Sequence, residues 1–350
     1  MYIYQSIFIL SLFCFLFSRN NQQKVNKSLC IVFAAISVIV IGLRDYTIGI
    51  DAFAYRDFYN AFIFKGLNSL TWDGFSNEVG FLILHVIFKE FSLSWYAFSF
   101  FCALVYIYPI FLLIYKKSEN VSFSILLFYI TGFFFFPMST VRQSIAMGFC
   151  LLSFISFDEK KYIKALLLTL LACTMHNSGL IFVIYMLISF VPLTKRNFKY
   201  WLVLGLVIAV ILKPFLLKFL LATMSLVGRD YEAMETGGNL QELFFIITFL
   251  LPFLFIKDID NFLAKNEYGM KFLFLAMILL PILQFHPALG RLYFYFSIFI
   301  IILIPNIFSN IKIVFIRNIG INLYLLVYLI LVSNYFQKSA CLFPYKFFFE

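Results

Sequence analysis

Two apolar runs stand almost back to back in the middle of the chain: Val121–Met138 (VSFSILLFYITGFFFFPM) and Val141–Phe157 (VRQSIAMGFCLLSFISF). Only two residues separate them, and their one charged residue, Arg142, lies at the start of the second run. An apolar run of about 18 residues is long enough to cross the hydrocarbon core of a bilayer as a helix. A chain that crosses lipid must also satisfy its own backbone hydrogen bonds, which a helix does. This stretch therefore predicts two membrane-spanning helices joined by a tight turn.

The rest of the sequence extends this pattern over the whole length. Of its 350 residues 63% are hydrophobic and only 13% are charged, with a mean hydropathy of +0.96. Such values exclude an ordinary soluble enzyme, a disordered chain and a disulfide scaffold. We expect an all-α polytopic membrane protein that forms one domain over residues 1–350, with about twelve spans near 2–17, 29–43, 95–115, 121–138, 141–157, 162–175, 178–193, 200–220, 243–256, 270–285, 291–308 and 318–335.

The apolar segment 79–90 is too short for a comfortable span, so we interpret it as a half-helix or re-entrant segment.

The distribution of charged residues is consistent with this map of spans. With both termini outside, the expected inner loops carry 16 of the 27 basic residues and 6 of the 17 acidic ones. The whole net charge of +10 then lies on the inner face, as topogenesis and anionic lipids favour. The basic residues are spread over many short loops, which excludes a nucleic-acid surface.

The expected outer side has two longer loops, 44–78 and 227–242, and collects ionisable residues from separate segments: Arg44, Asp51, Glu78, His85, Arg142, His176, Arg229, Asp230, His286 and Arg291. Taken singly, each has an ordinary explanation. An arginine at the end of a span can snorkel to lipid headgroups, and a histidine at a helix turn is more often a satisfied polar residue than a catalyst. Their convergence on one leaflet favours a polar cavity open to the extracytoplasmic face.

Several arginines with little local acid suit a phosphate or diphosphate, because a guanidinium binds its oxygens in pairs. A histidine or carboxylate nearby could take a proton from an attacking hydroxyl, and the aromatic rings of Tyr46 and Tyr55 suit sugars. No nucleotide-binding or zinc-hydrolase motif is present, and the outer loops contain no Asp-x-Asp pair, so we expect neither a cofactor nor a metal. These features together fit transfer of a glycan from a lipid diphosphate to a hydroxyl acceptor.

An ordered set of short motifs resembles the EpsG-like, Wzy-type polysaccharide polymerases. It comprises Arg44–Asp51 (RDYTIGID) followed by Tyr55, Glu78–Phe81 (EVGF), Arg142–Ala146 (RQSIA), Lys160–Tyr162 (KKY), His176–Ser178 (HNS) and Gly290–Phe294 (GRLYF). The order and spacing match over roughly residues 44–296. Two positions depart from the family: Val79 stands where proline is frequent, and Gly290 where an acidic residue often precedes the arginine.

The resemblance implies a fold similar to that of the membrane-embedded GT-C glycosyltransferases. It also implies a bacterial cytoplasmic-membrane enzyme that joins undecaprenyl-diphosphate-linked oligosaccharide repeat units at the extracytoplasmic face. In this interpretation Arg142 and Arg291 hold the diphosphate, and Arg44 and Arg229 are further phosphate contacts. His176 is the preferred general base, with Asp51 and Glu78 as rivals.

Three other functions stay open at this point. A flippase for the same lipid-linked units would also use many spans, although the crowding of polar residues in one leaflet argues against alternating access. A ligase that moves finished polymer to another acceptor shares the chemistry, and a non-catalytic scaffold would need none of the ionisable residues. The expected partners are the lipid-linked oligosaccharides and membrane lipids, with a chain-length regulator and a flippase as further candidates and no nucleic acid.

Overall fold

A computed structural model of the chain describes residues 2–17, 23–63, 78–211, 255–283, 287–338 and 342–349, together with residues 215, 218 and 222. Within these ranges the regular elements are all helices, and the β pairing consists of two isolated bridges, Arg44 with Phe347 and Ile256 with Ile311. The predicted all-α class is thereby confirmed. The chain divides into two compact units, residues 1–182 with 325–350, and residues 183–324. The single integral membrane domain stays a prediction.

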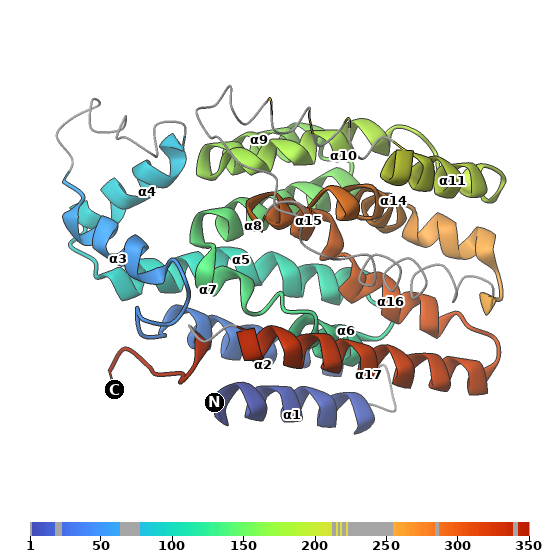
Figure 1. Cartoon of the computed structure of the whole chain (residues 1–350), viewed down its shortest axis with the longest axis horizontal. Coiled ribbons are helices and arrows are strands. Elements are labelled where there is room, and N and C mark those ends of the chain that lie inside the picture. Colours follow the sequence, from blue (N-terminus) through green and yellow to red (C-terminus); the bar gives the residue numbers. More distant parts are fainter. Residues whose placement is uncertain are drawn as a thin grey trace. The chain divides into compact units, whose positions relative to one another are not determined.

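The first unit contains six of the ten ionisable residues that the sequence places on the outer side, and its helices are labelled in Figure 1. Its elements are α1 (Tyr2–Phe17), α2 (Gln23–Gly42), α3 (Ala52–Ala61), α4 (Val79–Glu90), α5 (Trp95–Lys117), α6 (Val121–Ile130), α7 (Phe136–Ser139), α8 (Val141–Asp158), α9 (Tyr162–Met175) and the 3-10 turn η2 (Asn177–Leu180).

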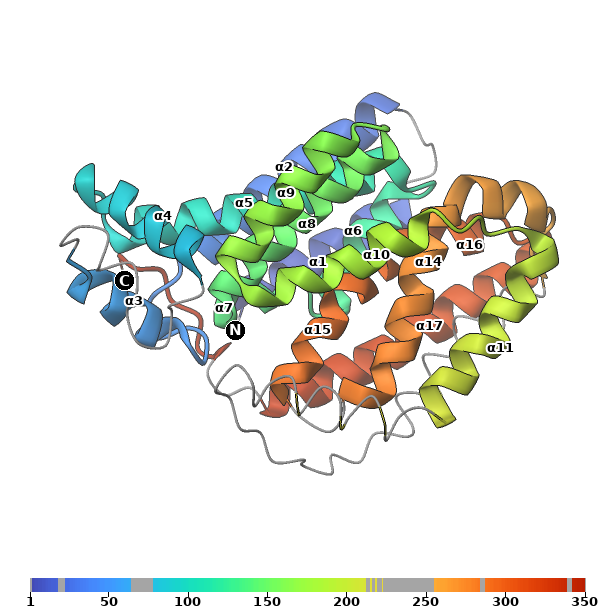
Figure 2. The same cartoon turned by 90° about the horizontal axis from the view of Figure 1, so that it is seen from above.

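The long helices of this unit pack side by side. Helix α5 packs against both α2 and α8 and lies between them in Figure 1, and α8 packs against α9, which runs along it in Figure 2. The crossing of α8 over α5 is close, because a Cβ atom on Gly148 would lie 2.3 Å from the carbonyl oxygen of Val105. A helix–helix contact built on such a small residue brings two backbones together, which is typical of packing in membranes.

One end of these helices is held by ion pairs. Lys116 and Lys161 both pair with Glu159, and Lys117 pairs with Asp158 at 2.5 Å. They join the last turn of α5 to the end of α8 and the loop between α8 and α9, all of which the sequence map places at the inner side. The opposite end of this helix bundle is where α4 and α8 begin and α9 ends.

The second unit is built around α14. Its elements are α10 (Ile181–Ser189), which begins at the boundary, α11 (Lys195–Ile211), α14 (Ile259–Leu283), α15 (Pro287–Ser297), α16 (Ile300–Ser309) and the first part of α17 (Val314–Lys338). Helices α11, α15 and α16 pack against α14. The rings of Tyr185, Phe272 and Phe299 form a continuous stack with centroid separations of 3.7 and 3.8 Å. Lys271 is buried and pairs with Glu267 at 2.8 Å, which satisfies a charge that would otherwise be costly to bury.

The structure corrects one predicted span and shows a turn within another. The run 121–138 is not one helix: α6 ends at Ile130, Gly132 has a φ of +85°, and α7 begins only at Phe136. A glycine with positive φ ends a helix readily because it lacks a Cβ atom. The run 291–308 contains a turn at residues 298–299 between α15 and α16, but the segment Arg291–Ser309 is still long and apolar enough to cross a membrane.

The predicted number of spans is not confirmed. Among the described residues three segments are long and apolar enough to cross a membrane: Val25–Gly42, Trp95–Lys117 and Arg291–Ser309. Five further apolar helices are shorter. The predicted span 243–256 lies almost entirely outside the described residues, whereas the short segment 79–90 is helix α4, with the predicted bounds.

Candidate functional site

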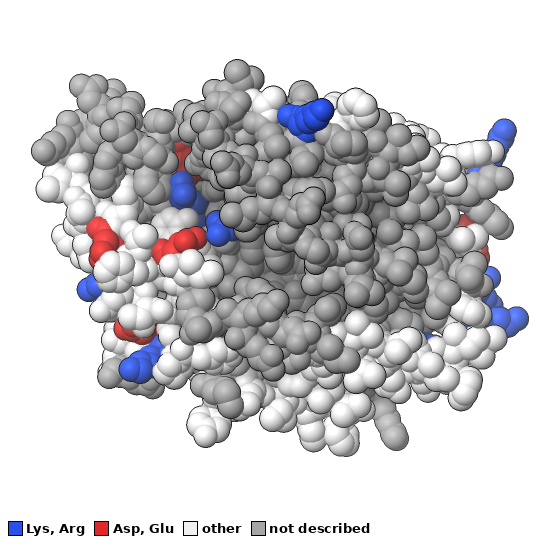
Figure 3. Space-filling model, in the orientation of Figure 1, with Lys and Arg blue, Asp and Glu red and all other residues white. Residues whose placement is uncertain are grey.

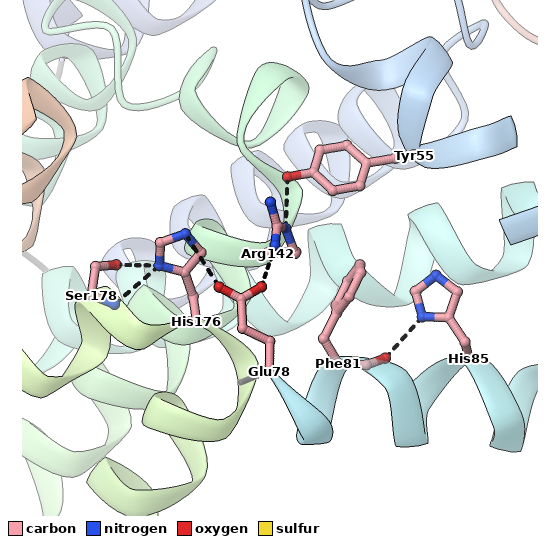
Figure 4. A network of polar contacts seen from close by, with 7 residues as sticks. All are labelled: Tyr55, Glu78, Phe81, His85, Arg142, His176 and Ser178. Carbon is pink, nitrogen blue, oxygen red and sulfur yellow. Dashed lines mark hydrogen bonds and ion pairs between the residues drawn. The ribbon is translucent and has the colours of Figure 1, made fainter. Parts of the chain in front are cut away.

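Three distant parts of the sequence meet around the carboxylate of Glu78 (Figure 4). We call Tyr55, Glu78, Arg142, His176 and Ser178 the Glu78 cluster. Glu78 immediately precedes α4, Arg142 is the second residue of α8, and His176 follows α9. The site therefore lies where one helix ends and two begin, and the long helices set its geometry.

Arg142 and Glu78 form an ion pair between the guanidinium Nη1 and the carboxylate Oε2. The guanidinium Nε also donates to the hydroxyl of Tyr55 at 3.2 Å. The Glu78 side chain is only 3% exposed, whereas that of Arg142 is 17% exposed. The carboxylate thus lies behind the guanidinium and holds it from the inner side, which leaves the cation nearer to solvent.

His176 lies on the other side of the same carboxylate. Its Nε2 is 3.7 Å from Oε1 of Glu78, and its side chain is 20% exposed. Its Nδ1 accepts the backbone N–H of Ser178 at 3.1 Å and lies 2.5 Å from the Ser178 hydroxyl oxygen. One buried carboxylate is therefore shared by two nitrogen side chains that both reach the surface of the site.

Gly80 permits this meeting. A Cβ atom at Gly80 would lie 2.2 Å from Oγ1 of Thr174 and 2.9 Å from Cε of Met175. Helix α4 consequently approaches the end of α9 more closely than any other residue would allow, and this contact places Glu78 beside His176. This close contact explains why a glycine stands two residues after Glu78 in the sequence.

Helix α3 brings the remaining members of the predicted site. Tyr55 is buried, and burial raises the pKa of its hydroxyl, so this group stays protonated near neutral pH. Asp51 is half-buried at the start of α3, one turn before Tyr55. Tyr46 is half-buried, and the Arg56 guanidinium lies 3.7 Å from the centre of its ring. Figure 3 shows acidic and basic side chains close together at the end where α3 and α4 lie.

Arg44 is placed differently from the prediction that it contacts phosphate. It is 3% exposed, and its guanidinium donates to the carbonyls of Ile41, Ile48 and Met138 and to the Ser99 hydroxyl. Burial lowers its pKa to about 10, which still leaves it charged near neutral pH. These contacts fasten the loop after α2 to α5 and α7, so the structure gives Arg44 a scaffold position.

The other two predicted phosphate contacts belong to the second unit of the chain. Arg291 lies in α15 of the second unit and is half-buried. Arg229 lies outside the described residues. Their roles stay predictions.

His85 lies in α4, the helix that begins just after Glu78, but is a core residue. It is fully buried, its Nδ1 donates to the carbonyl of Phe81 at 2.8 Å, and Figure 4 shows Phe81 between it and Glu78. Aromatic rings surround it with centroid separations of 4.5 to 5.8 Å: Phe58, Tyr59, Phe62, Phe81 and Phe98.

Ser178 is the member of the cluster to which sequence analysis gave no role. Its position is explained by a local turn in which the His176 side chain accepts the backbone N–H of Ser178, and the sequence marks this turn only through the His-Asn-Ser motif. No group of three or more His, Cys, Asp or Glu side chains able to hold a metal ion occurs among the described residues.

Comparison with known proteins identifies the family. Searches of curated proteins and of solved structures found no match to the chain. The model of the EpsG family matches residues 27–347, which span α2 to the C-terminal segment and include every residue of the Glu78 cluster. The chain therefore belongs to the EpsG family, and is a membrane protein of polysaccharide biosynthesis.

Proposed function

We propose that the protein is a Wzy-type polysaccharide polymerase that joins undecaprenyl-diphosphate-linked repeat units at the extracytoplasmic face of the bacterial cytoplasmic membrane. The observation that carries this proposal is the Glu78 cluster, in which Arg142 and His176 share one buried carboxylate. Family membership supports a glycosyltransferase-like polymerase in general, and the cluster supports an anionic substrate.

The exposure of the three charged side chains favours an anionic substrate. Glu78 is almost fully buried, whereas the side chains of Arg142 and His176 are 17% and 20% exposed. A substrate that approaches from solvent thus meets two nitrogen side chains before it meets the carboxylate. A guanidinium held in place from behind is suited to phosphate oxygens, which it binds through strong charge-assisted hydrogen bonds.

The proposed reaction exchanges one bond at the anomeric carbon for another. The bond from this carbon to the phosphate oxygen of the donor breaks, and a bond to a hydroxyl oxygen of the next repeat unit forms. The electron pair of the broken bond stays with the lipid diphosphate, and the hydroxyl proton passes to a base. Arg142 stabilises the charge that develops on the leaving diphosphate, an effect commonly worth about 10²- to 10³-fold in rate per contact.

The other predicted residues take supporting places in this proposal. Tyr55 orients Arg142 through its hydroxyl, and Tyr46 is the candidate glycan contact at the rim of the site. Arg291 and Arg229 are kept as candidate second contacts to the diphosphate. The base is one of the three predicted groups, Asp51, Glu78 or His176.

The experiment is a glycan length profile from a strain that lacks the gene, complemented with the wild type or with Arg142→Ala. Lys116→Ala is the matched control, since it removes an ion pair at the opposite end of the same helices. We expect lipid-linked single repeat units to accumulate in the deletion strain and with Arg142→Ala, while wild type and Lys116→Ala restore long chains. Membrane levels of each variant are checked by immunoblot.

Each alternative function gives a different profile. Long chains that stay on the lipid carrier in the deletion strain would indicate a ligase. Single units trapped on the inner leaflet would indicate a flippase. An unchanged profile would contradict any role in chain assembly.

A further inference from the structure

The local turn after α9 fixes which nitrogen of His176 carries a hydrogen. The backbone N–H of Ser178 donates to Nδ1 at 3.1 Å. A backbone N–H can only donate, so Nδ1 must offer its lone pair to it. In the neutral ring the single hydrogen is then on Nε2, which lies 3.7 Å from Oε1 of Glu78, a distance longer than a hydrogen bond.

Protonation of the ring does not change this conclusion for Nε2. The second hydrogen of an imidazolium goes to Nδ1, where the Ser178 hydroxyl oxygen, 2.5 Å away, can accept it. Nε2 therefore carries a hydrogen in both protonation states, and a nitrogen that already carries one cannot take a proton. Nδ1, the only nitrogen able to act as a base, is directed at Ser178.

We propose that His176 is a hydrogen-bond donor through Nε2 to a phosphate oxygen of the lipid-linked donor, held in this tautomer by Ser178, and is not the general base. This inference rests on the proposed function and assigns a role within that site. His176 and Arg142 then act on the same anion from the two sides of Glu78. The proton of the acceptor hydroxyl passes to a carboxylate, with Asp51, the more exposed of the two, as its acceptor.

The tautomer can be tested without any activity. The chain has only three histidines, so ¹⁵N-histidine labelling gives a simple nitrogen NMR spectrum of the purified protein. We expect His176 to show an unprotonated Nδ1 and a protonated Nε2. His85 is an internal reference of the opposite kind, because its Nδ1 faces the Phe81 carbonyl and must carry the hydrogen. A protonated Nδ1 with an unprotonated Nε2 at His176 would overturn the proposal.

The signals of His176 are assigned by their absence from the His176→Gln variant, or through its backbone neighbours should that variant fail to insert. Because the spectrum needs no substrate, its result stands apart from the fate of the proposed function. If the wild-type protein proves not to polymerise glycan, the tautomer of His176 can still be measured. If His176 has the other tautomer, the protein can still be a polymerase.

The donor role is tested by comparing His176→Gln with His176→Ala. A glutamine amide can donate near the position of Nε2 but cannot act as a base. With lipid-linked units extracted from the deletion strain as substrate, we expect His176→Gln to retain activity within about tenfold of wild type and to keep its pH profile. We expect His176→Ala to lose about 10²- to 10³-fold. Equal loss in both variants, or a pH profile whose acidic limb disappears in His176→Gln, would show that His176 is the base.

Discussion

At the scale of single residues, Glu78 determines the character of the site more than either cation does. Its carboxylate pairs with Arg142 and faces His176 while it is almost excluded from solvent. Removing one partner of a buried ion pair leaves the other without compensation, which usually costs more than the pair contributes.

We predict that Glu78→Ala lowers the free energy of unfolding by about 1–3 kcal/mol. This is less than the cost of breaking a fully buried ion pair, because water can still solvate the partly exposed Arg142. Thermal unfolding in detergent, followed by tryptophan fluorescence, measures the change. Glu159→Ala is the control, since Glu159 belongs to exposed pairs in which Lys116 and Lys161 lower its pKa to about 2. A shift for Glu78→Ala no larger than that of the control would contradict the central position of this carboxylate.

The choice of base is also a question of single residues. We predict that Asp51→Asn reduces polymer formation by about 10²-fold, the usual contribution of a general base, without lowering the amount of protein in the membrane. The reason is that its carboxylate lies one turn before Tyr55 and is more exposed than that of Glu78. Normal polymer length and rate with Asp51→Asn would exclude it as the base.

At the scale of helices, two glycines set the distances on which the site depends, and they differ in what lies opposite. Gly80 faces the side chain of Thr174, whereas Gly148 faces the backbone carbonyl of Val105. A side chain can be shortened by a second substitution, but a backbone carbonyl cannot.

We therefore predict that Gly80→Ala abolishes most activity and that Gly80→Ala combined with Thr174→Ala recovers part of it. The second change removes the oxygen that lies 2.2 Å from the new Cβ atom. Polymer formation and thermal stability of the single and double variants give the comparison. If Gly80→Ala alone behaves like wild type, close packing of α4 against α9 does not position Glu78.

The sequence predicted the helices well where apolar runs were bounded by charges, as for α8 and α9. The prediction was wrong where a helix ends inside an apolar run. Gly132 ends α6 within the run 121–138, yet hydropathy counts the turn and both helices as one segment. The length of an apolar run limits how many residues can cross, and it says little about a turn buried in protein.

The sequence indicates which ionisable residues lie together better than it indicates what each of them contacts. Glu78, Arg142 and His176 were chosen because they bring ionisable groups to one leaflet, and the structure does bring them together. Arg44 belonged to the same set, but its guanidinium donates to three backbone carbonyls. Such contacts depend on tertiary packing, so no pattern in the sequence distinguishes a buried structural arginine from one that binds phosphate.

At the scale of the whole molecule, the uneven distribution of charge predicts the orientation in the membrane. The loop after α2 is expected outside and the loop between α8 and α9 inside. Thr47 and Lys160 are exposed residues of these two loops, and Cys102 and Cys150 are buried thiols that add little background.

We predict that Thr47→Cys reacts with a membrane-impermeant maleimide in intact spheroplasts, whereas Lys160→Cys reacts only after the membrane is permeabilised. The wild-type protein under both conditions gives the background from its own cysteines. The reverse pattern would place the Glu78 cluster on the cytoplasmic side and would contradict polymerisation at the outer face.

The most direct test of the central claim uses purified protein in liposomes with lipid-linked repeat units from the deletion strain, added to the outer leaflet. Wild type, Arg142→Ala and Lys116→Ala are compared for the rate at which long glycan appears. We expect polymer from the wild type and from Lys116→Ala, and a rate about 10²- to 10³-fold lower from Arg142→Ala. A stably inserted Arg142→Ala that makes long polymer at the wild-type rate would contradict the claim that the Glu78 cluster performs the reaction.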